Sequence, residues 1–313
     1  MKKYTTINDI TNLPELIGDA MVLKKNPYTF QNIGKNKTLI MLFFNSSLRT
    51  RLSTQKAAQN LGMKVMVMNI SKDGWTLEFE DGTIMNSTAA EHVKEAAQVI
   101  SQYGDVLAIR TFAGLTDKSE DYNEKIMSAF VKYATIPVVS LESATEHPLQ
   151  ALTDAITITE HQQKNKPKVV LTWAPHPKAL PQAVANSFVK VMQHANVDFV
   201  ITHPKGYELN TQITHGVTIE YNQEKAFADA DFIYAKNWSS FTNYGKVLAM
   251  DTNWMITRKK MQLTNNAKFM HCLPVRRNVV VEDAVLDSEN SLVIQQANNR
   301  TFAAQIILKK IIE

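Results

Sequence analysis

The stretch Thr38-Leu-Ile-Met-Leu-Phe-Phe-Asn-Ser-Ser-Leu-Arg-Thr-Arg51 sets the fold, because a strand, a turn and a helix start follow one another within it. Residues 38–44 form a continuous apolar run, which is typical of a strand buried in a parallel sheet. Small and apolar residues then recur at helical spacing, at Thr54, Ala57, Ala58 and Leu61. Gly62 is a typical helix end. Residues 45–51 therefore occupy a strand-to-helix turn.

This turn has the composition of an anion site. Backbone N–H groups at a helix start and the helix dipole both favour a negative charge. Arg49 and Arg51 add guanidinium groups, which bind phosphate oxygens in a bidentate manner. The stretch alone also fits a capped helix with surface arginines. The motifs later in the chain favour the phosphate interpretation.

Length and composition indicate a globular protein of two domains. The chain has 313 residues, 44% hydrophobic and 20% charged, enough for two domains of about 150 residues each. The 34 basic and 30 acidic residues are spread along the chain, so no nucleic-acid partner is expected. The single cysteine, Cys272, excludes an internal disulfide and suggests a reducing compartment. No signal peptide or run of ~18 apolar residues is visible, which predicts a cytoplasmic protein without membrane association.

Strand-like and helix-like stretches alternate along most of the chain. Strands are predicted at 38–44, 65–68, 106–109, 137–140, 168–173, 197–201, 231–234 and 268–270. Helices are predicted at 50–61, 90–102, 122–133, 149–163, 182–194 and 222–229. This alternation indicates an α/β fold of parallel sheets flanked by helices. Ligands of such sheets bind beyond the carboxyl ends of the strands.

The two series of strands predict two similar lobes. We expect a first domain at 1–148, a second at 149–295, and a C-terminal helix at 296–313 that packs back on the first. Residues 70–89 are polar and lack periodicity, which predicts a mobile loop.

Two further motifs follow predicted strands. His147-Pro-Leu-Gln150 opens a helix, with a proline suited to its first turn, and offers two hydrogen-bonding side chains. His271-Cys-Leu-Pro-Val-Arg-Arg277 combines a thiol, an imidazole and two guanidiniums. Arg110 also directly follows a strand, where a surface arginine is the alternative. A low-pKa cysteine nucleophile is a possible reading of Cys272, but no hydrolase signature surrounds it, and one cysteine does not favour a zinc site.

Together these motifs resemble those of the transcarbamylase family. Ser47-Leu-Arg-Thr-Arg51 is similar to the family's Ser-Thr-Arg-Thr-Arg carbamoyl-phosphate motif, with Leu48 in place of threonine. His147-Pro-Leu-Gln150 and His271-Cys-Leu-Pro274 look like the second and third family motifs, in the right order. The resemblance covers essentially the whole chain. It implies the two-lobed transcarbamylase fold and a homotrimer, with an active site between the lobes and at the subunit interface.

The resemblance also implies roles for individual residues. Carbamoyl phosphate would be contacted by Ser47, Leu48, Arg49, Thr50, Trp75, Arg110, His147, Gln150, Cys272, Leu273 and Arg300. Trp75 would come from a neighbouring subunit, and Leu48 would keep only its backbone N–H contact. The residues expected to be catalytic are Arg49, Thr50, Arg110, His147 and Cys272. The chemistry requires no metal, cofactor or covalent enzyme intermediate.

The carbamoyl acceptor is indicated by a departure from ordinary ornithine transcarbamylases. Those enzymes carry an aspartate that holds the free α-ammonium, and here Lys236 stands at that position. A cation suits a substrate whose α-amine is acylated, and the pattern looks like the N-acylornithine branch of the family. That branch implies acylornithine contacts from Glu142, His176, Lys236 and Arg276. It also implies a knotted proline-rich loop, which residues 175–181 fit. A surface lysine is the alternative.

The acyl group is indicated by Ala90. In the acetyl-specific enzymes of the branch a glutamate near this position repels a succinyl carboxylate, and Ala90 leaves space for one. We therefore expect carbamoyl transfer to N-succinyl-L-ornithine in arginine biosynthesis, giving N-succinyl-L-citrulline and phosphate. Glu91 is adjacent, and a shift of one residue would reverse this argument. The alternatives are N-acetylornithine, a plain amine such as ornithine or putrescine, and a non-catalytic homologue that binds a phosphorylated ligand.

Overall fold

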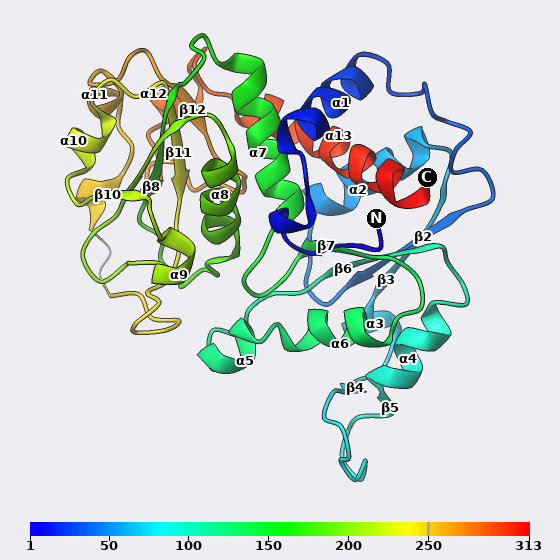
Figure 1. Cartoon of the computed structure of the whole chain (residues 1–313). Helices are drawn as coiled ribbons and strands as arrows, with labels where there is room; N and C mark the ends of the chain where they lie inside the picture. The colour runs from blue at the N-terminus through cyan, green and yellow to red at the C-terminus, as the bar shows by residue number, and fades with distance from the viewer. Residues whose placement is uncertain (249–250) are drawn as a thin grey trace. The chain divides into compact units, whose positions relative to one another are not determined.

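The computed structural model describes residues 1–248 and 251–313, which form two compact units. The first unit contains Met1–Leu149 and Arg300–Glu313, and the second contains Gln150–Asn299. Figure 1 shows that each unit is built around its own sheet. Among the described residues, no helix is long and apolar enough to cross a membrane.

The sheet of the first unit is parallel, with the strand order β1-β7-β6-β2-β3. Its strands are β1 (Lys3–Tyr4), β2 (Thr38–Phe43), β3 (Lys64–Asn69), β6 (Val106–Arg110) and β7 (Val138–Glu142). The three central strands are buried on both faces. This burial explains why their sequences are continuous apolar runs.

Helices cover both faces of this sheet (Figure 1). One face carries α1 (Leu13–Lys25), α2 (Arg49–Asn60) and the C-terminal part of α13 (Val293–Ile312). The opposite face carries α4 (Val93–Ile100) and α6 (Lys125–Tyr133), which pack on alternate residues of β2 and β6. The amide of Asn60 donates to Gln305 at 2.9 Å, so residues of α2 and α13 are joined inside the unit.

The second unit repeats this plan with the parallel order β10-β9-β8-β11-β12. Its strands are β8 (Lys168–Trp173), β9 (Asp198–Thr202), β10 (Thr218–Glu220), β11 (Phe232–Lys236) and β12 (Lys268–Met270). Helix α8 (Ala183–His194) covers one face through Phe188, which contacts Phe199 and Tyr234. The other face packs on α10 (Gln223–Phe227) and α12 (Asp283–Leu286). Helix α7 spans Pro148–His161.

The predicted strands and helices are confirmed to within a few residues, and several elements were missed. The strands β1 and β10 are too short to show a period. Helix α1 has a clear apolar stripe of Leu13, Leu16, Ile17, Ala20 and Leu23, so this signal was present in the sequence and overlooked. The helix predicted at 122–133 corresponds to α6 and begins three residues later than predicted, and the short helix α5 (Lys118–Tyr122) before it was missed.

The stretch predicted as a loop at 70–89 contains short elements. It includes α3 (Ile70–Asp73) and β4 (Leu77–Glu78), and β4 pairs in parallel with β5 (Glu91–His92). The backbone N–H of Ala90 donates to Thr76 at 3.0 Å, which extends this pairing by one hydrogen bond.

Each sheet has one point at which the order of the strands reverses. In the first unit it lies between β2 and β6, and in the second unit it lies between β8 and β11. Loops leave the sheet in opposite directions at such a point, and this geometry makes the usual ligand site of parallel α/β sheets.

Candidate functional site

The reversal point of the first unit carries the predicted phosphate turn. Phe43, the last residue of β2, is the register partner of Arg110, the last residue of β6. The chain leaves β2 into the turn, and α2 begins at Arg49, one residue before the predicted start. The first N–H groups of a helix lack partners in the helix itself. The turn and Arg110 therefore lie at the same edge of the sheet.

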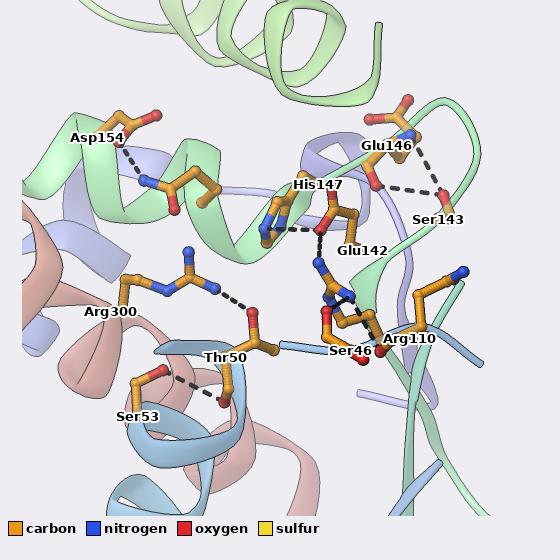
Figure 2. A network of polar contacts seen from close by, with 12 residues as sticks. Ser46, Thr50, Ser53, Arg110, Glu142, Ser143, Glu146, His147, Asp154 and Arg300 are labelled. Carbon is orange, nitrogen blue, oxygen red and sulfur yellow. Dashed lines mark hydrogen bonds and ion pairs between the residues drawn. The ribbon is translucent and has the colours of Figure 1, made fainter. Parts of the chain in front are cut away.

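Arg110 is held rigidly against this turn. Its Nη1 donates to the carbonyls of Asn45 at 3.1 Å and Ser46 at 2.6 Å. Its guanidinium carbon lies 4.1 Å from the centre of the Phe112 ring. Its Nη2 donates to Glu142 Oε2 at 3.0 Å (Figure 2). Burial lowers the pKa of the Arg110 guanidinium, and the Glu142 carboxylate opposes that effect.

Two buried guanidinium donors lack an acceptor in the described part of the chain. Among the described residues, no hydrogen-bond partner meets the buried Nε–H of Arg49 or that of Arg110. The charge of Arg49 also lowers the pKa of Arg110, so the two cations are near enough to repel each other. A buried donor without an acceptor costs about 1 to 3 kcal/mol, and more for a charged group. An anion bound at this edge would satisfy both donors and both charges.

His147 and Glu142 complete the cluster of the first unit. His147 is 3% exposed, and its Nε2 lies 3.7 Å from Glu142 Oε2. Figure 2 shows the Glu142 carboxylate between His147 and Arg110. The sequence placed Glu142 only with the acylornithine contacts. Its position beside Arg110 was missed, and the signal for it was that both residues end neighbouring strands.

Thr50 joins the turn to the end of the chain. Its Oγ1 accepts a hydrogen bond of 2.6 Å from Arg300 Nη2, and both residues are less than 10% exposed. A hydroxyl that accepts from a guanidinium keeps its own proton for donation. The Thr50 hydroxyl proton is therefore available for donation to a ligand.

The second arginine of the motif has a different task. The guanidinium of Arg51 donates to Asn69 at the end of β3 and lies 4.6 Å from the centre of the Phe43 ring. The sequence interpretation gave both arginines to the anion. In the structure the Nε–H of Arg49 has no acceptor among the described residues, whereas Arg51 contacts Asn69 and Phe43 and so holds the start of α2 against the sheet. Leu48 precedes the helix with its side chain 68% exposed.

Trp75 and Ala90 lie together on the β4–β5 segment. The indole Nε1 of Trp75 donates to Glu91 Oε2 at 2.9 Å, and the ring is 59% exposed. Ala90, whose backbone N–H donates to the carbonyl of Thr76, is exposed. The carboxylate of Glu91 is thus engaged by Trp75, whereas the small side chain of Ala90 is accessible.

The reversal point of the second unit carries a cationic cluster. Lys236 ends β11, and its register partner is Trp173, after which the chain continues to His176. Arg276 Nε donates to His176 Nε2 at 3.0 Å. Burial, followed by the charges of Arg276, Lys236 and Lys178, lowers the pKa of His176, while its hydrogen bond to Lys178 opposes this. These groups suit the carboxylates of a substrate.

Within this unit, hydrogen bonds connect Gln150 of the second predicted motif to the start of the third motif at His271. Gln150 Nε2 donates to Asp154 Oδ1 at 2.7 Å, and Gln296 Nε2 donates to the same oxygen at 2.6 Å. Gln296 Oε1 accepts from the backbone N–H of His271 at 3.0 Å. The buried Asp154 therefore links Gln150 to the His271–Pro274 segment. Sequence reasoning missed this role of Asp154.

Cys272 and Leu273 follow on that segment. Cys272 is partly exposed, and its sulfur is not part of a disulfide. Leu273 has a positive φ of 53°, a conformation that a non-glycine residue adopts only at a cost in free energy. The backbone N–H of Leu273 donates to His271 Nδ1 at 2.9 Å, which helps to hold this turn.

Family models match most of the chain. Residues 2–160 match the aspartate/ornithine carbamoyltransferase carbamoyl-P binding domain. Residues 181–311 match the Asp/Orn binding domain of the same enzymes.

Individual relatives are similar over their whole length. The chain is 51% identical to N-succinylornithine carbamoyltransferase of Bacteroides thetaiotaomicron, with 100% of this chain and 99% of that protein covered. It is 34% identical to N-acetylornithine carbamoyltransferase of Xanthomonas axonopodis pv. citri, with 95% and 92% covered. It is 28% identical to ornithine carbamoyltransferase of Listeria monocytogenes, with 96% and 92% covered.

One solved structure is also informative about ligands. It is an N-acetyl-L-ornithine transcarbamylase variant with a glutamate replaced by alanine, complexed with carbamyl phosphate and N-succinyl-L-norvaline. Its TM-score is 0.94 at 33% identity, and 99% of this chain and 100% of that chain are covered.

Proposed function

The chain belongs to the aspartate/ornithine carbamoyltransferase family and is a carbamoyltransferase, and we propose that it carbamoylates the side-chain amine of N-succinyl-L-ornithine. The amine nitrogen forms a bond to the carbamoyl carbon of carbamoyl phosphate, and the bond from that carbon to the phosphate oxygen breaks. The proton of the amine goes to the departing phosphate. The products are N-succinyl-L-citrulline and phosphate, as in arginine biosynthesis.

The observation that carries the carbamoyl-phosphate part is the pair of unsatisfied Nε–H donors on Arg49 and Arg110. The phosphate dianion would satisfy these donors, together with the N–H groups at the start of α2. Thr50 and His147 would donate to the oxygen of the carbamoyl carbonyl as its charge grows. Removing one such donor typically costs about 3 to 4 kcal/mol of barrier.

The proposal of an acylated acceptor is supported by the positive charge at the end of β11. Lys236 lies near His176 and Arg276, and no ion pair to Lys236 or Arg276 occurs within the described residues. A free α-ammonium would be repelled by these cations, whereas the α-carboxylate and the acyl carboxylate would be attracted. We therefore propose that His176, Lys236 and Arg276 contact the acylornithine, together with Glu142 and Ala90.

The succinyl group is favoured over acetyl by two observations. The relative with 51% identity is named for succinylornithine, whereas the relatives named for acetylornithine are 33–34% identical. An accessible Ala90 leaves room for the longer acyl group, and the alanine variant of the acetyl enzyme was complexed with an N-succinyl amino acid. N-acetyl-L-ornithine remains the second candidate acceptor.

A competition assay tests the acceptor. The enzyme receives carbamoyl phosphate with equal amounts of L-ornithine, N-acetyl-L-ornithine and N-succinyl-L-ornithine, and the three citrulline products are quantified by mass spectrometry. We expect the succinylated product to dominate. A preference for ornithine would contradict the Lys236 argument, and a preference for the acetyl compound would contradict only the Ala90 argument.

The assembly and location are further parts of the proposal. We propose a cytoplasmic homotrimer in which Trp75 reaches the carbamoyl-phosphate site of a neighbouring subunit. The exposed indole ring and its fixed position against Glu91 support a contact outside its own subunit. We also propose that residues 175–181 form the rim of a knotted loop in the second unit.

A further inference from the structure

Glu124 has a backbone conformation that needs an explanation. It lies between α5 and α6 with φ 53° and ψ 44°, in the left-handed region. A residue with a Cβ pays roughly 1–2 kcal/mol there. Its side chain makes no capping hydrogen bond to α6, although it occupies the N-cap position. The carboxylate is therefore directed at another part of the first unit.

That target is the loop between β7 and α7. The Glu124 carboxylate accepts hydrogen bonds from the Ser143 hydroxyl at 2.7 Å, the Thr145 N–H at 2.8 Å and the Thr145 hydroxyl at 2.6 Å. It also accepts from the Ala144 N–H at 3.2 Å. Burial raises the pKa of Glu124, and the donors from Thr145 and Ser143 oppose that effect. One carboxylate thus holds three consecutive residues.

The held loop is short and closed. The Ser143 N–H donates to the Glu146 carbonyl at 2.7 Å, and the Glu146 N–H donates to Ser143 Oγ at 3.2 Å (Figure 2). The residue before the loop is Glu142, and the residue after it is His147. Any shift of the loop therefore moves these two side chains against Arg110.

We infer that Glu124 is a positioning residue for His147, which it aligns with the carbamoyl carbonyl by fixing residues 143–145. This inference rests on the proposed function, because it needs His147 to donate to the oxyanion. Catalytic groups must be held to about 0.5 Å, and this precision requires supporting hydrogen bonds. Phosphate binding by Arg49 does not depend on the position of this loop.

Glutamine matches the size of Glu124 but has one acceptor oxygen where the carboxylate has two. In all four contacts the carboxylate is the acceptor, three times at Oε1 and once, from the Ala144 N–H, at Oε2. The amide of Glu124→Gln would turn its N–H₂ toward an N–H or O–H of the loop. The side chain would keep its size, but with its oxygen at the position of Oε1 its N–H₂ would face the Ala144 N–H, and in the opposite orientation it would face the other three donors.

The kinetic experiment compares Glu124→Gln with wild type, using carbamoyl phosphate and N-succinyl-L-ornithine. We expect kcat to fall 10- to 100-fold, with KM for carbamoyl phosphate within threefold of wild type. The matched control is Glu120→Gln, whose carboxylate forms an exposed pair with Lys125 at 2.8 Å. This control should keep kcat within twofold of wild type.

A second pair of variants tests the other end of the contact. Thr145→Val removes one donor to Glu124 and should lower kcat threefold to tenfold, whereas Thr145→Ser keeps the hydroxyl and should match wild type. If Glu124→Gln does not fold, this pair decides the question. The inference is overturned by an unchanged kcat, by an equal change in kcat and KM, or by equal loss in Thr145→Val and Thr145→Ser.

A measurement without turnover separates this inference from the proposed function. The imidazole signal of His147 is assigned in a ¹⁵N NMR spectrum by comparison with His147→Asn. We expect Glu124→Gln to shift this signal and Glu120→Gln to leave it unchanged. If no acylated ornithine reacts, the proposed function fails, and the NMR shift alone then reports whether Glu124 positions His147. An unshifted signal overturns the inference.

Discussion

Arg110 and Glu142 are register partners at the ends of neighbouring strands, and their side chains form a buried ion pair of 3.0 Å. The pairing is irregular between Ile109 and Arg110, and this irregularity brings Glu142 opposite Arg110. Because each side chain is 10% exposed or less, solvent screens the pair weakly. The carboxylate fixes the direction of the guanidinium, leaving its Nε–H without a protein acceptor in the described part of the chain.

Removing the Glu142 carboxylate should destabilise the protein. Glu142→Ala leaves the Arg110 charge buried without its partner, which typically costs about 3 to 5 kcal/mol. Urea unfolding of wild type and Glu142→Ala measures this loss. Glu282→Ala, at a partly exposed carboxylate that accepts from the backbone N–H of Arg258, should cost less. Equal stability of wild type and Glu142→Ala would contradict a structural role for the pair.

Substitution of Arg49 should lower activity, whereas substitution of Arg51 should lower stability. Arg49→Ala should lower kcat/KM by at least 1,000-fold, because it removes a charged donor from phosphate, with little change in Tm. Arg51→Ala should lose about 1 kcal/mol of stability, because it removes the contacts to Asn69 and Phe43. Steady-state kinetics and thermal melts check both. Arg49→Ala with activity near wild type would refute the phosphate role.

Ala90 should control the choice of acyl group. Ala90→Glu places a negative charge where the succinyl carboxylate is proposed to bind, so preference should move toward N-acetyl-L-ornithine by at least tenfold in kcat/KM. Ala89→Glu is the matched control, because Ala89 is less exposed than Ala90, and it should keep the wild-type preference. The same switch in both variants would show that position 90 has no special role.

Subunit mixing should reveal a shared site. If the proposed homotrimer forms, Trp75→Ala and Arg49→Ala should each be nearly inactive on their own. In exchanged hybrids, an intact Trp75 from one subunit can serve an intact Arg49 from another, so part of the activity should return. Kinetics after denaturation and joint refolding measure this recovery. Hybrids that form, as shown by mass spectrometry, and remain inactive would contradict a shared site.

The unfolding free energy should depend on pH through His176. The pKa of His176 is lowered in the folded protein, chiefly by burial, so the unfolded chain binds its proton first. Stability should therefore be present above pH 6.5 and decline as pH falls through the folded pKa. His203, also lowered by burial, adds to the same trend. The unfolding free energy, measured by urea denaturation at pH values from 7.5 to 5.5, should depend less steeply on pH in His176→Gln than in wild type. The same pH dependence in both proteins would contradict this assignment.

Sequence alone determined the order of strands and helices, because burial on both faces leaves continuous apolar runs such as residues 38–43. It also placed Arg49, Arg110, His147 and Lys236 at strand ends, since parallel strands direct their carboxyl ends to one edge. Only the tertiary structure decided the task of each group. Arg51 and Arg49 are equivalent in sequence, yet Asn69 and Phe43 engage just one of them. Glu124 reaches residues 143–145 across about twenty positions, and no local period records such a contact, because a hydrogen bond between distant segments depends on how the chain packs.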